Sequence, residues 1–485
     1  MHTIPVPTCQ PHLKVFDRPQ TLAVHSAALE ILEKTGIRLE HDAARRMIAE
    51  HGGRVYDDQW VRIPGYLAEK ALATAPRQII IYDQNGKRAM DLRDHNFYFG
   101  TGSDTTFTLD LDSGQRRRCV LNDTGRFARL VDALPNISFA MSMSNPKDVP
   151  RMDFIYVYAL AQMVRNTNKP LVFIADRLED ITLIHQLACL VTGGEDHLRR
   201  KPFILNYSEA ISPLRFPEHV VDRLIFCAQK EIPICLPSGS NAGGGAPVTL
   251  AGAMALGIAE NLAGLIIHQL TQPGAPFLFG PNVSALDMKS AVVSYGCPEW
   301  SLTQAALADM RDELYGLPIW SYAGASDAKV VDAQAGAEAM FSIATAMLSR
   351  CNLIHDVGYL EYGNTSSLEM LTIADELIAM AGHFTAGIEV NRDTLALEAL
   401  ERVKNAGAKG IFLTDDHTFD HFESALFLPG LLDRARYDNW QAEGGHDLYR
   451  RSNDKVRNIL SEHQLAPEKD DKLMKQMDKL LNTIK

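Results

Sequence analysis

The sequence predicts an α/β protein: a parallel (β/α)8 barrel of the TIM type with an N-terminal α+β cap and a C-terminal helical extension. The chain has 485 residues, enough for about three domains or for one large barrel with an extension. Eight short strand-like runs follow one another at a spacing of roughly 30 to 43 residues, and each precedes a stretch of helical periodicity. The main competitor, a doubly wound open sheet, would normally need a phosphate-binding glycine turn, and no G-x-G-x-x-G follows an early strand.

The cap is expected over residues 1–95. Residues 18–36 carry apolar side chains at helical spacing and end at Gly36, a helix stop. Two further helical stretches, around 43–50 and 64–75, precede a short β-rich run at 79–82. This mixture of helix and strand indicates a small α+β unit in front of the barrel.

The catalytic barrel is expected over residues 96–400. Its strand-like runs are bounded by Gly, Pro, Asn or Ser, and the spacing between them suits one strand, one helix and two loops. The eight runs are residues 97–100, 137–141, 171–175, 203–207, 232–236, 276–280, 317–322 and 352–357.

The C-terminal extension, residues 401–485, is expected to be mostly helical. Residues 367–387, just before it, have helical periodicity, and residues 406–413 form a small apolar run. Asp415 is placed to cap a further helix. Residues 454–485 combine Lys, Asp and Glu with Leu, which predicts an amphipathic helix or helix pair whose charged face is solvated or packs against another subunit.

The composition excludes several classes of function. With 48 Lys and Arg against 60 Asp and Glu, the formal charge is −12, which removes the main source of affinity for a nucleic acid. The seven cysteines form no C-x-x-C pair, so we expect reduced thiols and no structural zinc. Residues 1–10 carry no secretory pattern, and the apolar stretch 248–270 contains Glu260 and His268, typical of a buried helix. We therefore expect a cytoplasmic protein that binds neither nucleic acid nor membrane.

The predicted strand ends are rich in aromatic side chains and in neutral or acidic polar groups. In a (β/α)8 barrel, the catalytic face is built from the carboxyl ends of the strands. An anionic ligand would need Arg or Lys there, and only Lys329 is well placed. Aromatic faces stabilise a quaternary ammonium by ~0.5–2 kcal/mol each, so a cationic ligand fits better.

Other catalytic patterns have little support. No H-E-x-x-H and no G-x-S-x-G occurs, so we predict neither a tightly bound metal nor a serine hydrolase, and we assign His268, His383 and His417 no partner at ligand spacing. The glycine run 243–245 either lets the backbone approach a flat ligand or is a plain flexible loop. His355 differs from the other histidines because it falls at a strand end beside Asp356, where a functional and a structural role are both open.

Four segments resemble the trimethylamine methyltransferase family: residues 99–104, 239–244, 324–338 and 427–434. The stretch D-A-K-x-x-D-A-Q-A-G-x-E, from Asp327 to Glu338, is the most specific part, and the likeness runs from about Arg18 to the tail. The resemblance implies a (β/α)8 barrel that moves a methyl group from a methylamine to the Co(I) atom of a corrinoid (cobalamin type) carried by a separate small protein. The sequence contains only the standard twenty amino acids, which points to the pyrrolysine-free branch with quaternary amines as substrates.

Within that chemistry, we assign roles to the strand-end residues. Asp104 and Glu209 would balance the charge of the cation, and Asp327 would also contact the substrate. Asn206, Asn241 or a helix-start amide would hold a substrate carboxylate, and His355 is the catalytic candidate, near the ligand or the cobalt face. The expected aromatic cage consists of Tyr98, Phe279, Trp320, Tyr322 and Tyr359.

The expected reaction is demethylation of glycine betaine to dimethylglycine, with proline betaine, carnitine or another quaternary amine as alternatives. A quaternary nitrogen leaves as a neutral amine, so Co(I) can displace it without a general acid. Two readings from other classes remain open: a non-catalytic betaine-binding protein, and a barrel lyase or aldolase that forms a Schiff base through Lys329. We expect a homo-oligomer on general grounds.

Overall fold

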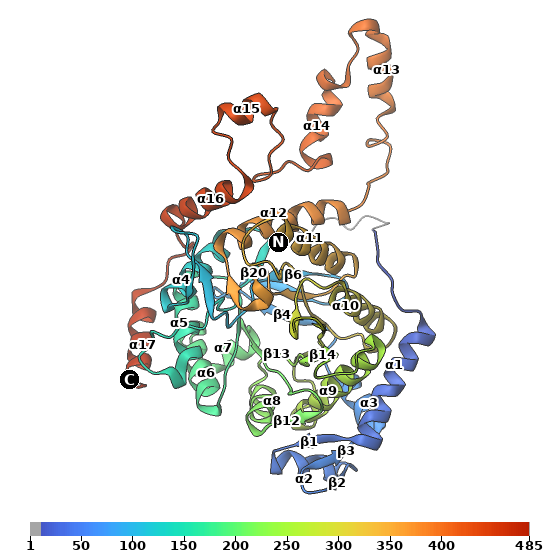
Figure 1. Ribbon diagram of the computed structural model, residues 1–485, viewed down its shortest axis with the longest axis vertical. Coiled ribbons are helices and arrows are strands. Elements are labelled where there is room, and N and C mark those ends of the chain that lie inside the picture. The colour runs from blue at the N-terminus through green and yellow to red at the C-terminus, as the bar shows by residue number, and fades with distance from the viewer. Residues whose placement is uncertain (1–10, 485) are drawn as a thin grey trace.

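The structure, a computed structural model, describes residues 11–484, so the expectation for residues 1–10 lies outside the described part of the chain. The molecule has a mixed α/β body, from which a C-terminal segment with helices α13 and α14 projects (Figure 1).

Eight parallel strands form two four-stranded sheets, ordered β10–β11–β13–β15 and β18–β19–β6–β9. Isolated parallel bridges link the two sheets on both sides, one from Ala140 to Leu171 and one from Phe279 to Ile319. Pairing therefore runs from each strand to the next in chain order and returns to the first, and each of the eight predicted runs contains one of these strands. The strands are β6 (Tyr98–Gly100), β9 (Ile137–Phe139), β10 (Leu171–Phe173), β11 (Ile204–Tyr207), β13 (Ile234–Cys235), β15 (Phe277–Leu278), β18 (Trp320–Tyr322) and β19 (Leu353–His355).

Helices alternate with these strands along the chain. They are α4 (Leu121–Ala133), α5 (Ile155–Asn166), α6 (Leu178–Thr192), α7 (Glu195–Arg200), α8 (Glu218–Lys230), α9 (Leu250–Thr271), α10 (Pro298–Met310), α11 (Ala333–Leu348) and α12 (Leu368–Thr385). Helix α9 is long and apolar enough to cross a membrane by length and composition, but 83% of its most apolar window is buried inside the protein. Its Glu260 accepts hydrogen bonds of 2.7 Å from the Ser212 hydroxyl and the Leu214 amide. The prediction of a buried core helix at 248–270 is confirmed.

The strands fill the space that they surround with alternate side chains, because successive residues of a strand point to opposite faces. One apolar cluster joins Phe139, Met141, Val172, Leu205, Cys235, Leu278, Trp320 and Leu353. The same cluster includes Ile79, Ile81, Met90 and Leu92 of a hairpin made by β4 (Ile79–Tyr82) and β5 (Arg88–Leu92). This hairpin contacts the amino-terminal part of the ring, and the sequence predicted only its first strand.

The rest of the N-terminal region packs on the outside of the ring. Helix α1 (Arg18–Glu30) and helix α3 (Gly65–Thr74) contact α9, and β1 (Ile37–Leu39) pairs in parallel with β12 (Arg215–Phe216). The remaining elements of this region are α2 (Asp42–Glu50), β2 (Arg54–Tyr56) and β3 (Trp60–Arg62), as the predicted α+β composition requires.

Short strands after the ring strands extend the carboxyl side of the molecule. Strands β7 (Phe107–Leu109) and β8 (Arg116–Arg118) form a sheet with β20 (Tyr359–Leu360) and β21 (Thr365–Ser366). A second small sheet contains β14 (Ser240–Ala242), β16 (Val283–Asp287) and β17 (Val292–Ser294). Both sheets follow strand ends, where they can shape a site.

The C-terminal region consists of helices joined by turns and loops. Residues 406–413, the predicted apolar run, contain parts of two short 3-10 turns, Gly407–Lys409 and Phe412–Thr414. The tail contains a pair of helices: the first contacts α12 and α4, the second contacts α5 and α6, and both also carry charged side chains that face solvent. The helices are α13 (Leu397–Asn405), α14 (Asp416–Ala425), α15 (Tyr437–Ala442), α16 (Leu448–Glu462) and α17 (Asp471–Asn482).

Candidate active site

The floor of the candidate site is an aromatic group on the inner face of the ring. Tyr207, Trp320 and His355 each lie an even number of residues from a side chain of the inner cluster, so they face inward. The Trp320 and His355 rings lie 4.5 Å apart, and Tyr207 lies 5.6 Å from Trp320 and 5.9 Å from His355. The three aromatic side chains cover the apolar interior of the ring of strands on its carboxyl side.

His355 is held in a neutral state. Its Nδ1 lies 2.8 Å from the carbonyl oxygen of Ser321, and its Nε2 lies 3.3 Å from Oδ2 of Asp356. Burial lowers the pKa of His355 to about 3, whereas burial and the neighbouring Glu209 raise the pKa of Asp356 well above its usual range. The two side chains therefore face each other in their neutral forms, and the hydrogen bond of the His355 ring runs from Nδ1–H to the carbonyl oxygen of Ser321.

Two further carboxyl groups flank this floor. The Tyr207 hydroxyl donates to Glu209, and the Tyr156 hydroxyl donates to Asp104 at 3.3 Å. Burial raises the pKa of Glu209, and burial together with repulsion from Asp176 and Glu209 raises the pKa of Asp104 to about 7. The other Asp104 oxygen has no hydrogen-bond partner among residues 11–484. A bound cation would favour the ionised form of such a desolvated carboxyl group and would be attracted by its charge.

Glu209 also indicates the shape of the site. Its side chain is exposed to solvent, yet surrounding protein raises its pKa by desolvation. Tyr295 is half-buried and its pKa is likewise raised well above its usual range by burial. These groups come from the carboxyl ends of the ring strands and from the loops that follow them. We call the space that they border the recess and define it by Asp104, Tyr207, Glu209, Tyr295, His355, Asp356 and Tyr359.

Aromatic rings from separate loops form the wall of the recess. The Tyr295 ring lies 6.3 Å from that of Tyr359 and 4.7 Å from that of Trp300. Tyr322 stacks on Trp300 at 3.6 Å, and its hydroxyl donates to the carbonyl oxygen of Tyr295 at 3.4 Å. The Tyr359 hydroxyl donates to the carbonyl oxygen of Ser103. The wall is therefore tied to the loop that carries Asp104.

The loop after β6 can approach the wall only because it contains glycine. A Cβ atom on Gly102 would lie 2.2 Å from the Tyr359 hydroxyl and 2.4 Å from Oδ1 of Asp356. Thr105, which follows Asp104, donates to the carbonyl oxygen of Met143 at 2.6 Å and anchors the loop from the other side. Any side chain at position 102 would push the Asp104 loop away from the recess.

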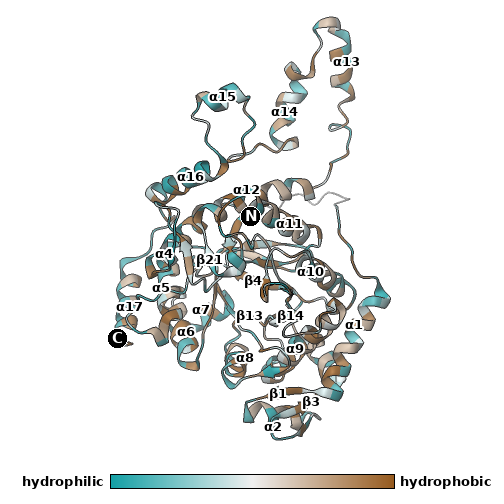
Figure 2. Cartoon of the chain, in the orientation of Figure 1, coloured by the Kyte–Doolittle hydropathy of each residue, from teal (hydrophilic) through white to brown (hydrophobic). Residues whose placement is uncertain are grey.

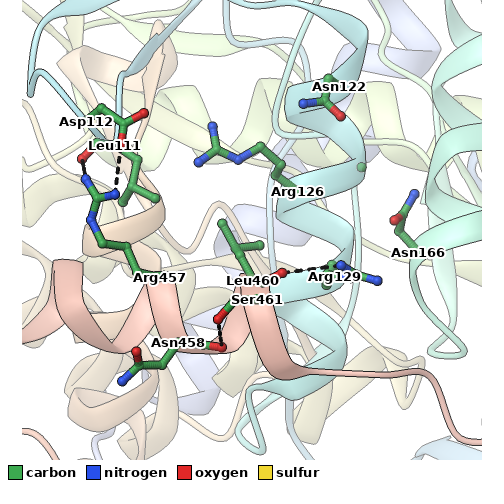
Figure 3. A pocket seen from close by; sticks show the side chains of 11 residues that line it. Leu111, Asp112, Asn122, Arg126, Arg129, Asn166, Arg457, Asn458, Leu460 and Ser461 are labelled. Carbon is green, nitrogen blue, oxygen red and sulfur yellow. Dashed lines mark hydrogen bonds and ion pairs between the residues drawn. The ribbon is translucent and has the colours of Figure 1, made fainter.

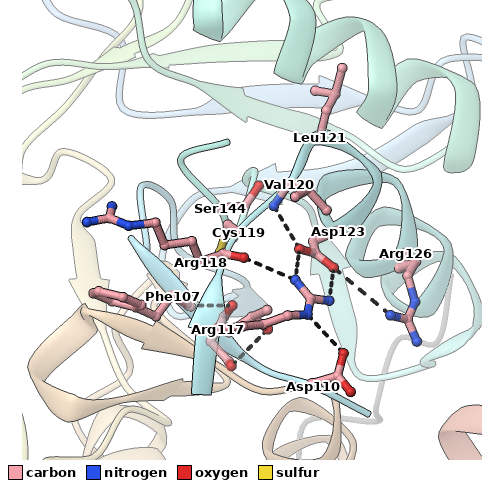
Figure 4. A network of polar contacts seen from close by, with 12 residues as sticks. Phe107, Asp110, Arg117, Arg118, Cys119, Val120, Leu121, Asp123, Arg126 and Ser144 are labelled. Atoms are coloured by element: carbon pink, nitrogen blue, oxygen red, sulfur yellow. Dashed lines mark hydrogen bonds and ion pairs between the residues drawn. The ribbon is translucent and has the colours of Figure 1, made fainter. Parts of the chain in front are cut away.

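The β7–β8 hairpin fixes the same loop from outside, through an arginine between two carboxylates (Figure 4). Arg117 donates to both oxygens of Asp123 at 2.7 and 2.8 Å and to Asp110 at 2.9 Å. Neighbouring Arg116 lies over the Phe107 ring, 3.4 Å from its centroid, and forms an ion pair with Glu361. These contacts hold the segment between β6 and α4 in place.

The D-A-K-x-x-D-A-Q-A-G-x-E stretch positions the wall rather than the ligand. The Asp327 carboxylate accepts hydrogen bonds from the Tyr295 amide at 2.8 Å and the Gly296 amide at 3.1 Å. Glu338 in turn accepts from the Asp327 amide at 2.8 Å and the Ser326 hydroxyl at 2.6 Å. Asp332 caps α11. Asp327, assigned to the substrate from sequence, has its carboxylate bound to the backbone that carries Tyr295.

Four other assigned residues do not join the recess. Tyr98 lies at the start of β6, where its hydroxyl accepts from the Asp91 amide of the β5 strand. Phe279 packs on Tyr315, with ring centroids 4.7 Å apart, outside the ring of strands. Asn206 lies between Leu205 and Tyr207 and therefore faces the helices, and Asn241 accepts a hydrogen bond from Ser284 in the β14–β16 sheet.

The structure brings Asp104, Glu209, Trp320, Tyr322, His355 and Tyr359 together, as assigned, and adds residues that were not assigned. Tyr207 and Asp356 could have been found from sequence, because Tyr207 ends the strand run two residues after Leu205 and Asp356 follows His355. Tyr295 and Trp300 lie beyond the β16–β17 hairpin, and no local pattern places that segment beside strand β19.

Basic groups contribute little to the recess. Lys147 lowers the pKa of Asp104 and Arg223 lowers that of Glu209, but burial outweighs both effects. Arg223 is buried and already donates to the Ser208 hydroxyl and to the carbonyl oxygens of Ala175 and Asp176. Lys329 is exposed and its amine donates to the carbonyl oxygen of Asp327 at 2.7 Å, and the Lys147 amine donates to Asn145 at 2.9 Å.

One histidine was wrongly left without a partner. His417 and His421 are four residues apart on α14, with ring centroids 4.4 Å apart, and His421 Nε2 lies 3.3 Å from Oδ2 of Asp393. No group of three or more His, Cys, Asp or Glu side chains in residues 11–484 has a geometry that could hold a metal ion.

A hollow of about 600 Å³ lies between α4, α5 and α16 (Figure 3). Three arginines line it, but Arg457 is paired with Asp112 at 2.7 Å and Arg129 donates to the carbonyl oxygen of Leu460 at 3.3 Å. These contacts attach the C-terminal helix α16 to the body. This hollow lies among the outer helices and shares no residue with the recess.

Comparison with known proteins places these features in context. Residues 2–483 match the family described as trimethylamine methyltransferase (MTTB). The glycine betaine methyltransferase of Desulfitobacterium hafniense strain Y51 is 30% identical over 89% of both chains. A trimethylamine methyltransferase MttB of Methanosarcina barkeri strain Fusaro is 31% identical over 94% of this chain and 92% of its own. The solved monomethylamine methyltransferase of Methanosarcina barkeri is 12% identical, covers 93% of this chain and 95% of its own, and has a TM-score of 0.48.

Proposed function

Because the chain belongs to the trimethylamine methyltransferase family and is a methyltransferase, we propose that it transfers a methyl group from a quaternary amine to the Co(I) corrinoid of a partner protein. The ring of strands acts in this proposal as a (β/α)8 barrel, residues 96–400, with the recess at its mouth. The mouth is the side on which a corrinoid carried by another protein can approach.

The observation that carries the proposal is the combination of acids and aromatic rings in the recess. Glu209 and Asp104 supply negative charge, and Tyr207, Tyr295 and Tyr359 supply ring faces and hydroxyl groups. A quaternary ammonium cannot donate a hydrogen bond, so rings and desolvated carboxylates are what recognise it. The basic side chains near Asp104 and Glu209 are few, and Arg223 is already bonded elsewhere.

The chemistry needs no proton transfer. The N–CH₃ bond breaks with its electron pair remaining on nitrogen, which leaves as a neutral tertiary amine, and the methyl group bonds to cobalt through the electron pair of Co(I). The protein's task is to orient the cation and exclude water. A neutral His355, hydrogen-bonded through Nδ1 to Ser321, suits a role in shaping the floor and contacting the ammonium group rather than in acid–base catalysis.

Glycine betaine is the first candidate substrate, with dimethylglycine as product. A relative with 30% identity is named for it, and the recess lacks an obvious requirement for a longer tail. Asn206 and Asn241 are not placed to hold its carboxylate, so that group would be bound by a tyrosine hydroxyl. Proline betaine and carnitine are the alternatives, and a cytoplasmic location fits a Co(I) acceptor.

The test is anaerobic mixing of the protein with Co(I) cobalamin and a panel of tertiary and quaternary amines. We expect methyl-Co(III) absorbance with quaternary amines, glycine betaine foremost, together with one equivalent of the demethylated amine. Methyl transfer from trimethylamine alone, or from none of the amines, would contradict the proposal. The purified corrinoid protein replaces free cobalamin once it is identified.

A further inference from the structure

The most unusual surface of the molecule is the segment that projects from the body between α12 and α16. We define the arm as residues 386–429. The chain leaves the body after α12, passes through α13 and α14, and returns at Gly430, where the Glu376 carboxylate accepts hydrogen bonds from the amides of Gly430 and Leu431 at 2.8 and 3.0 Å (Figure 1). The family-like segment 427–434 forms this re-entry point, so it has a structural role at the base of the arm.

The arm is polar inside and apolar outside. Its two helices are joined by a two-bonded ion pair between Arg402 and Asp415, at 2.7 and 2.9 Å, and by the contact of His421 with Asp393. Large apolar side chains face solvent instead, with Ile388, Leu413 and Phe419 exposed by 85, 81 and 78%. The others are Val390, Leu395, Leu397, Leu400, Ile411, Phe412, Leu426 and Leu428. In Figure 2, brown, hydrophobic segments recur along α13 and α14.

Such a surface exceeds what a monomer exposes. The arm presents 11 large apolar side chains that are each exposed by 46% or more. At about 100 Å² of exposed apolar area per side chain, this amounts to roughly 1,100 Å² per arm, whereas the largest apolar patch of a monomer is about 300–600 Å². Two arms related by a two-fold axis would bury roughly 2,200 Å², above the ~1,600 Å² of a standard interface.

The body of the same chain offers a surface for the arm to cover. The solvent-facing side of α11 carries Ala333, Ala337 and Phe341 at a spacing of four residues, with Phe341 exposed by 48%. Its one acidic residue, Glu338, is bound to Ser326 and to the Asp327 amide. Phe384, at the end of the neighbouring α12, is also exposed. A flat apolar face thus lies next to the base of the arm.

The geometry points to a second copy of this chain as the occupant: the arm of one copy packs on the arm and the α11 face of the other. A corrinoid protein must bind and leave in every turnover, which would expose the arm repeatedly, whereas permanent interfaces are the large apolar ones. The arm and the recess share no residue, so this inference does not depend on the proposed substrate.

The test is the mass of the full chain by sedimentation equilibrium between about 1 and 50 μM. We expect a dimer or a larger even-numbered assembly for the unmodified protein. The triple substitution Leu413→Asp, Phe412→Asp and Phe419→Asp should give a monomer with an unchanged far-ultraviolet circular dichroism spectrum, because these side chains are exposed within one chain. The control is Val55→Asp, which also places a charge at an exposed apolar position, on strand β2 at the opposite end of the molecule. It should leave the mass unchanged.

Phe341→Asp tests the receiving surface separately and should raise the dissociation constant at least 10-fold. A monomeric unmodified protein at 50 μM, or an assembly whose mass the arm substitutions do not change, would overturn the proposal. An unchanged dissociation constant for Phe341→Asp would overturn the assignment of α11 as the surface that the arm covers. If the arm variant kept the mass of the unmodified assembly but no longer bound the corrinoid protein, the corrinoid protein would be the occupant of the arm and the proposal would be overturned.

Discussion

The two ends of the ring of strands are built from the same strands but serve opposite purposes. At the amino end, the β4–β5 hairpin packs Ile79, Ile81, Met90 and Leu92 against the inner side chains. At the carboxyl end, the side chains change to Tyr207, Glu209 and His355, with the desolvated acids Asp104 and Glu209 and an unsatisfied Asp104 oxygen beside them. One end is filled for stability, and the other keeps polar groups at a cost in stability that a bound cation would offset in the proposed function.

The difference shows that the inward position alone does not make a residue functional. Leu353 and His355 both face inward on strand β19, but only His355, on the carboxyl side, borders the recess. Period-two alternation therefore selects the face, and position along the strand selects the role. The predictions below test whether the two ends separate stability from activity.

The largest effect is expected at the filled end. Leu92→Ala removes a fully buried side chain from the hairpin and leaves a cavity, so the free energy of unfolding should fall by about 2–5 kcal/mol. Methyl transfer per folded molecule should change less than about threefold, because Leu92 lies away from the recess. Denaturant titration and initial rates well below the unfolding temperature measure the two quantities. A large loss of activity with unchanged stability would remove the separation between the ends.

At the open end, Glu209→Gln removes a negative charge without changing shape. Loss of a charge-assisted contact of about 1.5–3 kcal/mol should lower kcat/KM for a quaternary amine roughly 100-fold. The free energy of unfolding should stay the same or rise, since burial already disfavours the charged form of Glu209. Glu50→Gln, an exposed glutamate on α2, is the matched control and should have no effect on either quantity. Equal rates for Glu209→Gln and the unmodified protein would exclude Glu209 from substrate binding.

His355→Gln tests the floor of the recess. Glutamine can keep the hydrogen bond to Ser321 but not the ring that packs on Trp320, so we expect methyl transfer to slow roughly tenfold with the fold intact. Because burial lowers the pKa of His355 to about 3, the ring is neutral at every pH above that value, and the unmodified enzyme should show no rate change from this histidine near pH 6.5. A step near pH 6.5 that disappears in His355→Gln would contradict the neutral assignment.

The smallest effect is a pH dependence from Asp104. Its pKa of about 7 means that the carboxyl is protonated below pH 7 and charged above it, so KM for a cationic substrate should fall several-fold between pH 6 and pH 8. Asp104→Asn should remove the part of the KM change that comes from Asp104, and any pH dependence of KM that persists then reports on Glu209. The effect on stability is unfavourable. Because the pKa of Asp104 is higher in the folded than in the unfolded state, the unfolded state loses its proton first, and the free energy of unfolding falls as pH rises from about 4 to 7. A KM that rises with pH would contradict this assignment.

Much of the ring could be predicted, because its strands leave a local pattern. Each predicted run contains one ring strand, since short apolar segments bounded by turn residues recur at the length of a strand–helix unit. Asp104, Glu209 and His355 were assigned from their position at strand ends, and their roles stay predictions. The domain boundaries at residues 95 and 400 stay predictions, because the β4–β5 hairpin belongs to the core of the ring and α16 and α17 pack on its helices.

The errors have a common physical cause. Tyr98 and Phe279 are aromatic and close to strand ends in sequence. Tyr98, however, lies at the amino end of its strand, and Phe279 points outward. A shift of one residue decides whether a side chain faces inward or outward. Asp327 has the residue type of a ligand but binds the backbone amides of residues 295 and 296, far along the chain. Tyr295 was missed because a hairpin of tertiary origin brings it to the recess, and no local pattern encodes such contacts.

The central claim is that the recess selects a permanent positive charge. The most direct measurement compares, by isothermal titration calorimetry, the quaternary amine that turns over fastest with its carbon isostere, in which a quaternary carbon replaces the nitrogen. The two molecules have the same shape and differ in charge alone. We predict that the amine binds at least tenfold more tightly and that Glu209→Gln reduces this preference. Equal affinity for the two, or tighter binding of the uncharged isostere, would contradict the account.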